Sequence, residues 1–202
     1  MKKILLALFL SAVSAFGASS PSPIFDVTKF GARPGKTALN VTNDQVAIQR
    51  PVDAASTNGG TVYFPPGWYG LGTDFVYPTY LTEGLPSSIT IRSNNVYLMG
   101  DGPSSVTITQ VVWSGGGDNM FGAGNDATSS GPSGVGIIGM RIYGSGSTSD
   151  TIQFQTTTNT IFKDLQIFNS SHDAIDVQGG GPVYIENFMC TNARMNSISA
   201  LN

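Results

Sequence analysis

Three side chains that could exchange protons with a substrate lie close together near the C-terminal end of the sequence. His172, the single histidine of the 202 residues, precedes Asp173, and Asp176 follows three positions later. Two carboxyl groups on one surface can hydrolyse a glycosidic bond, one protonating the leaving oxygen while the other activates water or attacks carbon. Crowding raises the pKa of one carboxyl, which separates the two roles. We therefore select Asp173, Asp176 and His172 as candidate catalytic residues.

Polar residues at matching repeat positions are candidates for binding the substrate. Asp150 and Gln153 stand 23 residues before Asp173 and Asp176, and we expect the two pairs to form outward-facing columns. Lys163 and Arg194 add positive charge, although the two do not share a column. No metal site and no cofactor are predicted, except that a lyase could use aspartates on this face to bind Ca²⁺.

A structural role is the alternative for the same aspartates. Asp150 and Asp173 each precede a short apolar run and could cap turns by accepting backbone N–H groups, and Asp176 could be a solvated strand residue. The types and spacing of these residues leave both interpretations open.

The elements that position these residues repeat one another. DTIQFQ at Asp150, DAIDVQ at Asp173 and NSISAL at Asn196 follow at steps of 23, and each comes after a second short apolar run, GMRIY, DLQIF or NFMCT. Alternating apolar residues predict strands, and a fixed period predicts a solenoid. The sequence thus predicts an all-β fold, a parallel β-helix, with Met140, Leu165 and Phe188 in one inward column and Ile142, Ile167 and Cys190 in another. The Gly, Thr, Ser and Asn content disfavours a helical solenoid.

Both ends of the chain carry separate information. Residues 1–17, MKKILLALFLSAVSAFG, combine two lysines, a short apolar run and small residues, as in a secretory signal peptide. We expect a secreted protein, extracellular or periplasmic, with no membrane segment in the mature form. Residues 24–202 are expected to form one β-helix domain. NSISALN stops in mid-pattern, so we expect a chain truncated at its C-terminal end, or a subunit that covers the open coil.

Composition narrows the range of partners. The net charge of -3 and the sequence pI near 4.9 provide no basic surface for nucleic acid.

Between Ile24 and Tyr69 the pattern predicts a strand, a turn and a short helix with Ile48, Val52 and Ala55 on one face, which would cap the end of the solenoid. Pro51 is expected to kink or break this helix.

The same region resembles a known group. FDVTKFGA, NDQVAIQ and NGGTVYFPPGWY, in this order, resemble the N-terminal signature of the pectate lyase-like superfamily, which includes polygalacturonases, polysaccharide lyases and phage tailspikes. The resemblance implies a right-handed parallel β-helix with a short N-terminal capping helix. The usual Gly-Asp-Gly turn and paired aspartates before the helix are replaced by a single Asp44.

A second resemblance concerns the site. SHDAIDV is similar to the Asn-Thr-Asp-Gly/Ala-Ile/Phe-Asp strand of polygalacturonases and aligns Asp173 with their catalytic aspartate. Met195 and Asn196 stand where the next coil of that family has paired aspartates, so the catalytic set is incomplete. The resemblance implies cleavage of a pectin-like polysaccharide, with a hydrolase favoured over a lyase.

Two other classes of protein fit the same scaffold. A non-catalytic glycan-binding or surface adhesion module is favoured by the missing aspartates and by the polar Thr, Ser and Asn faces. A structural trimer of the tailspike kind is the third, against which the signal peptide argues.

Overall fold

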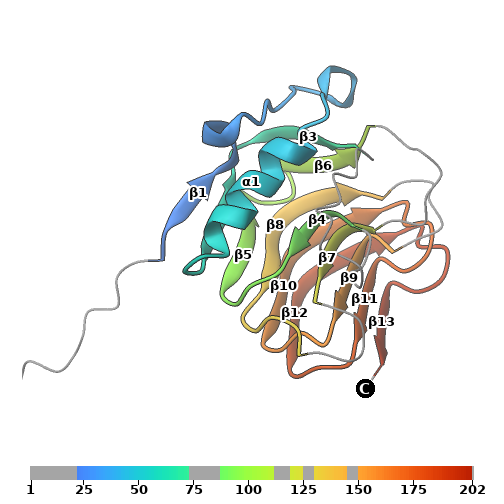
Figure 1. The fold of residues 1–202 in the computed structure, drawn as a ribbon. Coiled ribbons are helices and arrows are strands. Elements are labelled where there is room, and N and C mark those ends of the chain that lie inside the picture. Colours follow the sequence, from blue (N-terminus) through green and yellow to red (C-terminus); the bar gives the residue numbers. More distant parts are fainter. Residues whose placement is uncertain (1–21, 73–86, 112–118, 125–129, 145–149, 202) are drawn as a thin grey trace, which may run out of the picture.

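The computed structural model of the chain is a right-handed parallel β-helix, as predicted (Figure 1). It describes residues 22–72, 87–111, 119–124, 130–144 and 150–201. The predicted signal peptide at residues 1–17 lies outside them. In the described part of the chain, no helix is long and apolar enough to cross a membrane.

Each coil contributes to two parallel sheets. The larger sheet has the order β1-β2-β5-β8-β10-β12, with β3 and β6 joined to it, and the smaller has the order β13-β11-β9-β7-β4. The strands are β1 (Ile24–Asp26), β2 (Gly60–Phe64), β3 (Gly67–Leu71), β4 (Ser87–Ile91), β5 (Val96–Gly100), β6 (Val106–Gln110), β7 (Asn119–Ala123), β8 (Gly136–Tyr143), β9 (Ile152–Gln155), β10 (Thr160–Phe168), β11 (Ile175–Gln178), β12 (Val183–Thr191) and β13 (Ile198–Leu201).

The strand register confirms the columns expected from the repeats. Leu165 pairs with Met140 on one side and Phe188 on the other, and Ile175 pairs likewise with Ile152 and Ile198. Leu165 and Ile175 are fully buried. Alternate residues of the inner strands therefore fill one core that runs along the solenoid.

The long strands turn a corner at one residue of left-handed conformation. Gly139, Asp164 and Asn187 have φ angles of 67°, 52° and 51°, a region that glycine, asparagine and aspartate adopt most readily. Asn187 Nδ2 donates to Asp164 Oδ1 at 2.6 Å, and Asn192 Nδ2 donates to Asn169 Oδ1 at 3.1 Å. The second bond stacks asparagine amides of neighbouring coils on one another.

A helix covers the N-terminal end of the solenoid. After the 3-10 turns η1 (Val27–Phe30) and η2 (Ala38–Asn40), helix α1 (Gln45–Ala55) buries Ile48, Val52 and Ala55 against β4, β1 and β2. Helix α1 continues through Pro51, so the expected break does not occur. Pro51 lies on the buried face, where packing compensates for the local cost of proline.

The opposite end of the solenoid is less covered. β12 and β13 are the outermost strands of their sheets, and Ile185 and Ile198 are 37% and 41% exposed. Phe188 and Cys190 continue the inward columns but are only half-buried, because they pack against β10 on one side alone.

Replacing a central core residue by alanine should destabilise the fold. We expect Leu165→Ala to lower the free energy of unfolding by about 2–5 kcal/mol, since it leaves a cavity between two coils. Met189→Ala, at a side chain that is 42% exposed on the neighbouring strand, should change it by less than about 0.5 kcal/mol. Urea denaturation measures both, and equal losses would contradict the assigned register.

Candidate functional site

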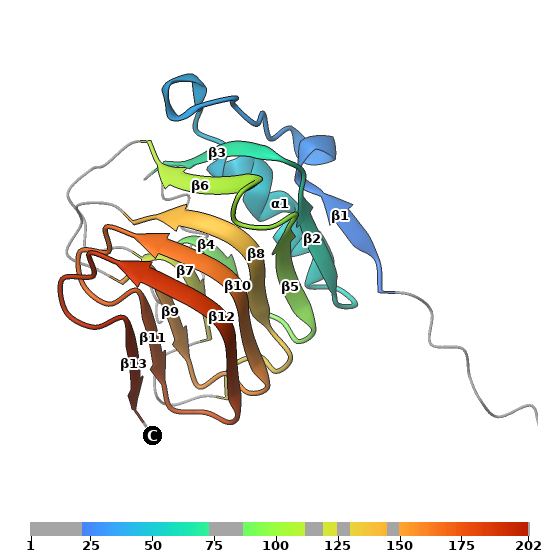
Figure 2. The ribbon, with the colours of Figure 1, turned by 180° about the vertical axis from the view of Figure 1, so that it is seen from behind.

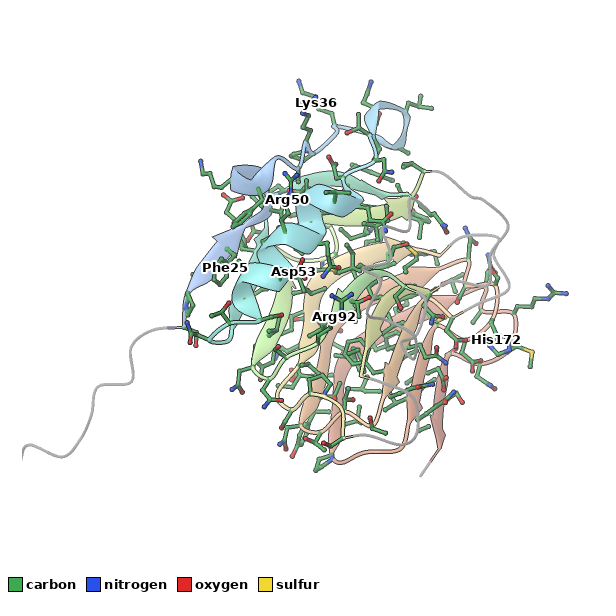
Figure 3. The ribbon with its side chains drawn as sticks, viewed as in Figure 1. Phe25, Lys36, Arg50, Asp53, Arg92 and His172 are labelled. Atoms are coloured by element: carbon green, nitrogen blue, oxygen red, sulfur yellow. The ribbon has the colours of Figure 1, made fainter. Side chains whose placement is uncertain are left out.

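The candidate residues meet at the turns that lead into the smaller sheet. His172 and Asp173 lie between β10 and β11, and Asp150 lies just before β9 in the preceding coil. Figure 3 shows His172 at the side of the molecule opposite Phe25. Its Nδ1 atom lies 2.7 Å from Asp150 Oδ1 and 3.9 Å from Asp173 Oδ2. The His172 side chain is 44% exposed, whereas those of Asp150 and Asp173 are 9% and 6% exposed.

The aspartates also connect one coil with the next. Asp150 Oδ1 accepts the backbone N–H of Asp173 at 2.9 Å, and Asp173 Oδ1 accepts that of Asn196 at 2.7 Å. The two carboxylates thus accept backbone N–H groups, as the structural interpretation of Asp150 and Asp173 expects. The N–H groups come from the following coil, however, and not from the aspartate's own turn.

Asp176 belongs to a separate network on the outer face of the smaller sheet. Its Oδ2 atom accepts from Gln153 Nε2 at 3.0 Å and also from Gln178 Nε2. Gln153 Oε1 in turn accepts from Asn119 Nδ2 at 2.8 Å. Asp176 itself is 3% exposed.

These positions correct the expectation of an exposed carboxylate pair. Asp150, Asp173 and Asp176 are all buried, and one oxygen of each accepts a hydrogen bond from a neighbouring coil. The titratable group of this cluster that faces solvent is His172. The catalytic roles of Asp173, Asp176 and His172 remain predictions.

The electrostatics single out the contact between Asp150 and His172. Burial raises the pKa of the Asp150 carboxyl, an effect that the hydrogen bonds from His172 and from the Asp173 N–H oppose. The hydrogen bond to Asp150 raises the pKa of His172. A carboxylate only accepts hydrogen bonds, so neutral His172 must carry its proton on Nδ1, which leaves the Nε2 lone pair available.

The two basic candidates lie in different surroundings. The Arg194 backbone N–H donates to Ser170 O at 3.0 Å, and the Met195 N–H donates to His172 O at 3.3 Å. These bonds place Arg194 one coil beyond the turn that carries His172, and Arg194 is exposed there. Lys163 precedes the corner at Asp164 and forms an ion pair with Glu186 at 2.9 Å, so the structure does not bring it to the cluster.

The cluster could also hold a metal ion, although the sequence predicted none. Asp150, His172 and Asp173 each offer a ligand atom, and these atoms lie within 4.8 Å of one another. One imidazole nitrogen with two carboxylate oxygens suits Zn²⁺ or Mn²⁺ better than Ca²⁺, which prefers six to eight oxygens. Sequence reasoning missed the Asp150–His172 contact, although the step of 23 already aligned Asp150 with the neighbour of His172.

Comparison with curated proteins gives one partial relative. No family model matches the chain. Mannuronan C5-epimerase AlgE6 of Azotobacter vinelandii is 39% identical over 90 residues, which is 43% of this chain and 9% of that protein. The chain therefore spans a small part of this relative's length.

Solved structures show the fold. A glycosyl hydrolase-like protein of Parabacteroides merdae has a TM-score of 0.61 and 14% identity, covering 88% of this chain and 80% of that one. The Streptococcus pneumoniae surface protein and adhesin PfbA also has 0.61, with 18% identity over 86% of this chain and 42% of its own. An iota-carrageenase has 0.57 and 18% identity, over 85% and 38%. The chain thus has the parallel β-helix fold that these carbohydrate-active and surface proteins share.

The single histidine allows a direct test of the contact. We expect the pKa of His172, followed by NMR of the imidazole, to exceed the ordinary value of about 6.5. Asp150→Asn should lower this pKa, whereas Asp101→Asn, a change at a distant exposed carboxylate, should not. Because folding raises this pKa, the stabilisation from the pair is full below about pH 6.5 and is lost as the pH rises through the folded-state pKa. An unchanged pKa in Asp150→Asn would contradict the contact.

Proposed function

We propose that the protein modifies a polysaccharide and that His172 is its acid–base group. The observation that carries this proposal is the half-exposed imidazole whose Nδ1 atom is held by the buried carboxylate of Asp150. A buried carboxylate that fixes the tautomer and orientation of a solvent-facing histidine is an arrangement suited to general base catalysis. The polysaccharide-acting proteins among the comparisons support the choice of substrate class.

The reaction that fits this geometry best begins with proton removal from carbon. In a uronic acid unit, His172 Nε2 would take the proton from C5 while Arg194 neutralises the adjacent carboxylate. If the bond from C4 to oxygen then breaks, a C4=C5 double bond forms and the leaving oxygen takes a proton from solvent. If a proton returns to the opposite face of C5, the product is the epimer. Similarity to a mannuronan C5-epimerase supports this first step.

Hydrolysis, which the resemblance to polygalacturonases favours, is less well supported by the positions of the two carboxyl groups. Asp173 or Asp176 would have to reach a glycosidic oxygen, whereas both residues are buried and one oxygen of each carboxylate already accepts a hydrogen bond. For this reason we place base-catalysed elimination or epimerisation before hydrolysis. A lyase with bound Ca²⁺ is a less good fit, because the cluster contains a nitrogen ligand.

A glycan-binding or adhesion module is the second candidate. The observation in its favour is that Asp150 and Asp173 both have a structural role between coils. The likeness to the adhesin PfbA fits this alternative. Under either function we propose that the protein is exported, on the basis of the signal-like residues 1–17.

Product analysis separates these functions. With a panel of pectin, mannuronan and neutral polysaccharides, we expect unsaturated sugars, seen by ultraviolet absorbance, or epimerised units, seen by NMR. His172→Asn should reduce product formation by about 100-fold or more. Asp101→Asn serves as a matched control and should keep full activity. Reducing ends without absorbance would establish hydrolysis instead, and binding without any product would establish the module.

The pH dependence tests the role of His172 as a base. Activity should rise with pH as the imidazole loses its proton, and the raised pKa of His172 should place the midpoint above about 6.5. In Asp150→Asn the pKa falls, so the midpoint should move to lower pH while the maximal rate decreases. A midpoint that stays in place in this variant would exclude His172 as the base.

A further inference from the structure

The outer side of the larger sheet carries a run of large apolar and aromatic side chains. Residues that alternate with the core residues point away from it, and the register aligns them in two columns. We define the apolar face as the large apolar and aromatic members of these columns: Ile24, Tyr63, Tyr97, Met99, Ile138, Ile161 and Tyr184. Figure 2 looks onto β2, β5, β8, β10 and β12, and no described element lies over them.

The exposure of this face contrasts with the polarity of the other sheet. Ile24, Met99 and Tyr184 are 72%, 42% and 58% exposed, and the other four are half-buried. The outer side of the smaller sheet instead carries Gln153, Gln155, Asp176 and Gln178. Contiguous apolar patches on a protein surface are often functional, which makes this face a candidate interaction surface. Its aliphatic centre offers no partners for sugar hydroxyls, which favours a protein over a glycan.

We propose that the apolar face binds the same face of a second copy of this chain. A two-fold axis between β5 and β8, parallel to the strands, makes the face self-complementary. Met99 then meets Ile138 of the other copy, and Tyr97 lies over Gly136, which has no side chain to obstruct it. Lys163 meets Tyr63 and Asp101, which are joined by a 2.7 Å hydrogen bond. Asp26 and Glu186 meet at the solvated rim, where like charges cost little.

The size of the face predicts a weak, reversible dimer. Six strands at about 4.8 Å, with four residues of about 3.3 Å each before the corner, give roughly 29 by 13 Å, or about 380 Å² per copy. The pair would bury roughly 750 Å², which is below the range of stable specific interfaces and within that of weak, transient ones. We therefore expect dissociation constants between about 1 µM and 1 mM. His172 stays open in this dimer, because it follows the far end of β10.

Sedimentation of the full chain over a range of concentrations tests the proposal. The weight-average mass should rise from monomer to dimer across this range. Met99→Glu, at the centre of the face, should weaken association by about tenfold or more, since it places a charge in the contact. Val46→Glu is the matched control, because Val46 is 47% exposed on α1, away from the face. Circular dichroism and melting temperature establish that both variants fold.

The alternatives give different results. A monomer at every concentration overturns the proposal. A dimer that survives Met99→Glu but is lost in Ile198→Glu has its contact at the open end of the solenoid. A trimer requires a different symmetry. Each of these two results also overturns the proposal. Product formation by His172 is independent of the dimer, so activity measured on the same variants distinguishes failure of this proposal from failure of the proposed function.

Discussion

The stacking of one coil on the next in fixed register is the constraint on which the rest of this structure depends. No coil buries its apolar residues alone, since Leu165 is covered only because Met140 and Phe188 lie on either side of it. The same register repeats the left-handed corner residues and aligns asparagine amides between coils. Where the neighbour is missing, as beside β12 and β13, identical positions become exposed.

The candidate site is a product of this constraint. Asp150 accepts the backbone N–H of Asp173 because the two positions are equivalent in neighbouring coils, and the same oxygen reaches the imidazole of His172. Burying a carboxylate costs several kcal/mol in an apolar setting, and the backbone N–H and imidazole bonds offset that cost. One aspartate thus joins two coils and orients the histidine that faces solvent. Chemistry at this position would use a group that the fold already holds in place.

Much of the fold could be predicted because it depends on periodicity. The step of 23 residues predicted the strands and their register, and the apolar residues on one side of residues 45–55 predicted the capping helix. The candidate site was harder to predict, because periodicity shows which residues occupy equivalent positions in neighbouring coils and not how deeply they are buried. Asp173 and Asp176 were expected to form one exposed pair, whereas both are buried and belong to separate networks, through the Asn196 N–H and through Gln153. Pro51 was misjudged because its cost is local while its compensation comes from packing.

The central claim is that the register of the coils holds His172 with its proton on Nδ1, directed at Asp150, and its Nε2 atom open to a substrate. The most direct measurement is the tautomer of His172, read from the ¹⁵N chemical shifts of the two ring nitrogens at a pH above the pKa. We expect a protonated Nδ1 and an unprotonated Nε2 in the native chain. A protonated Nε2 would mean that Asp150 does not hold the ring, and would contradict the account of the site.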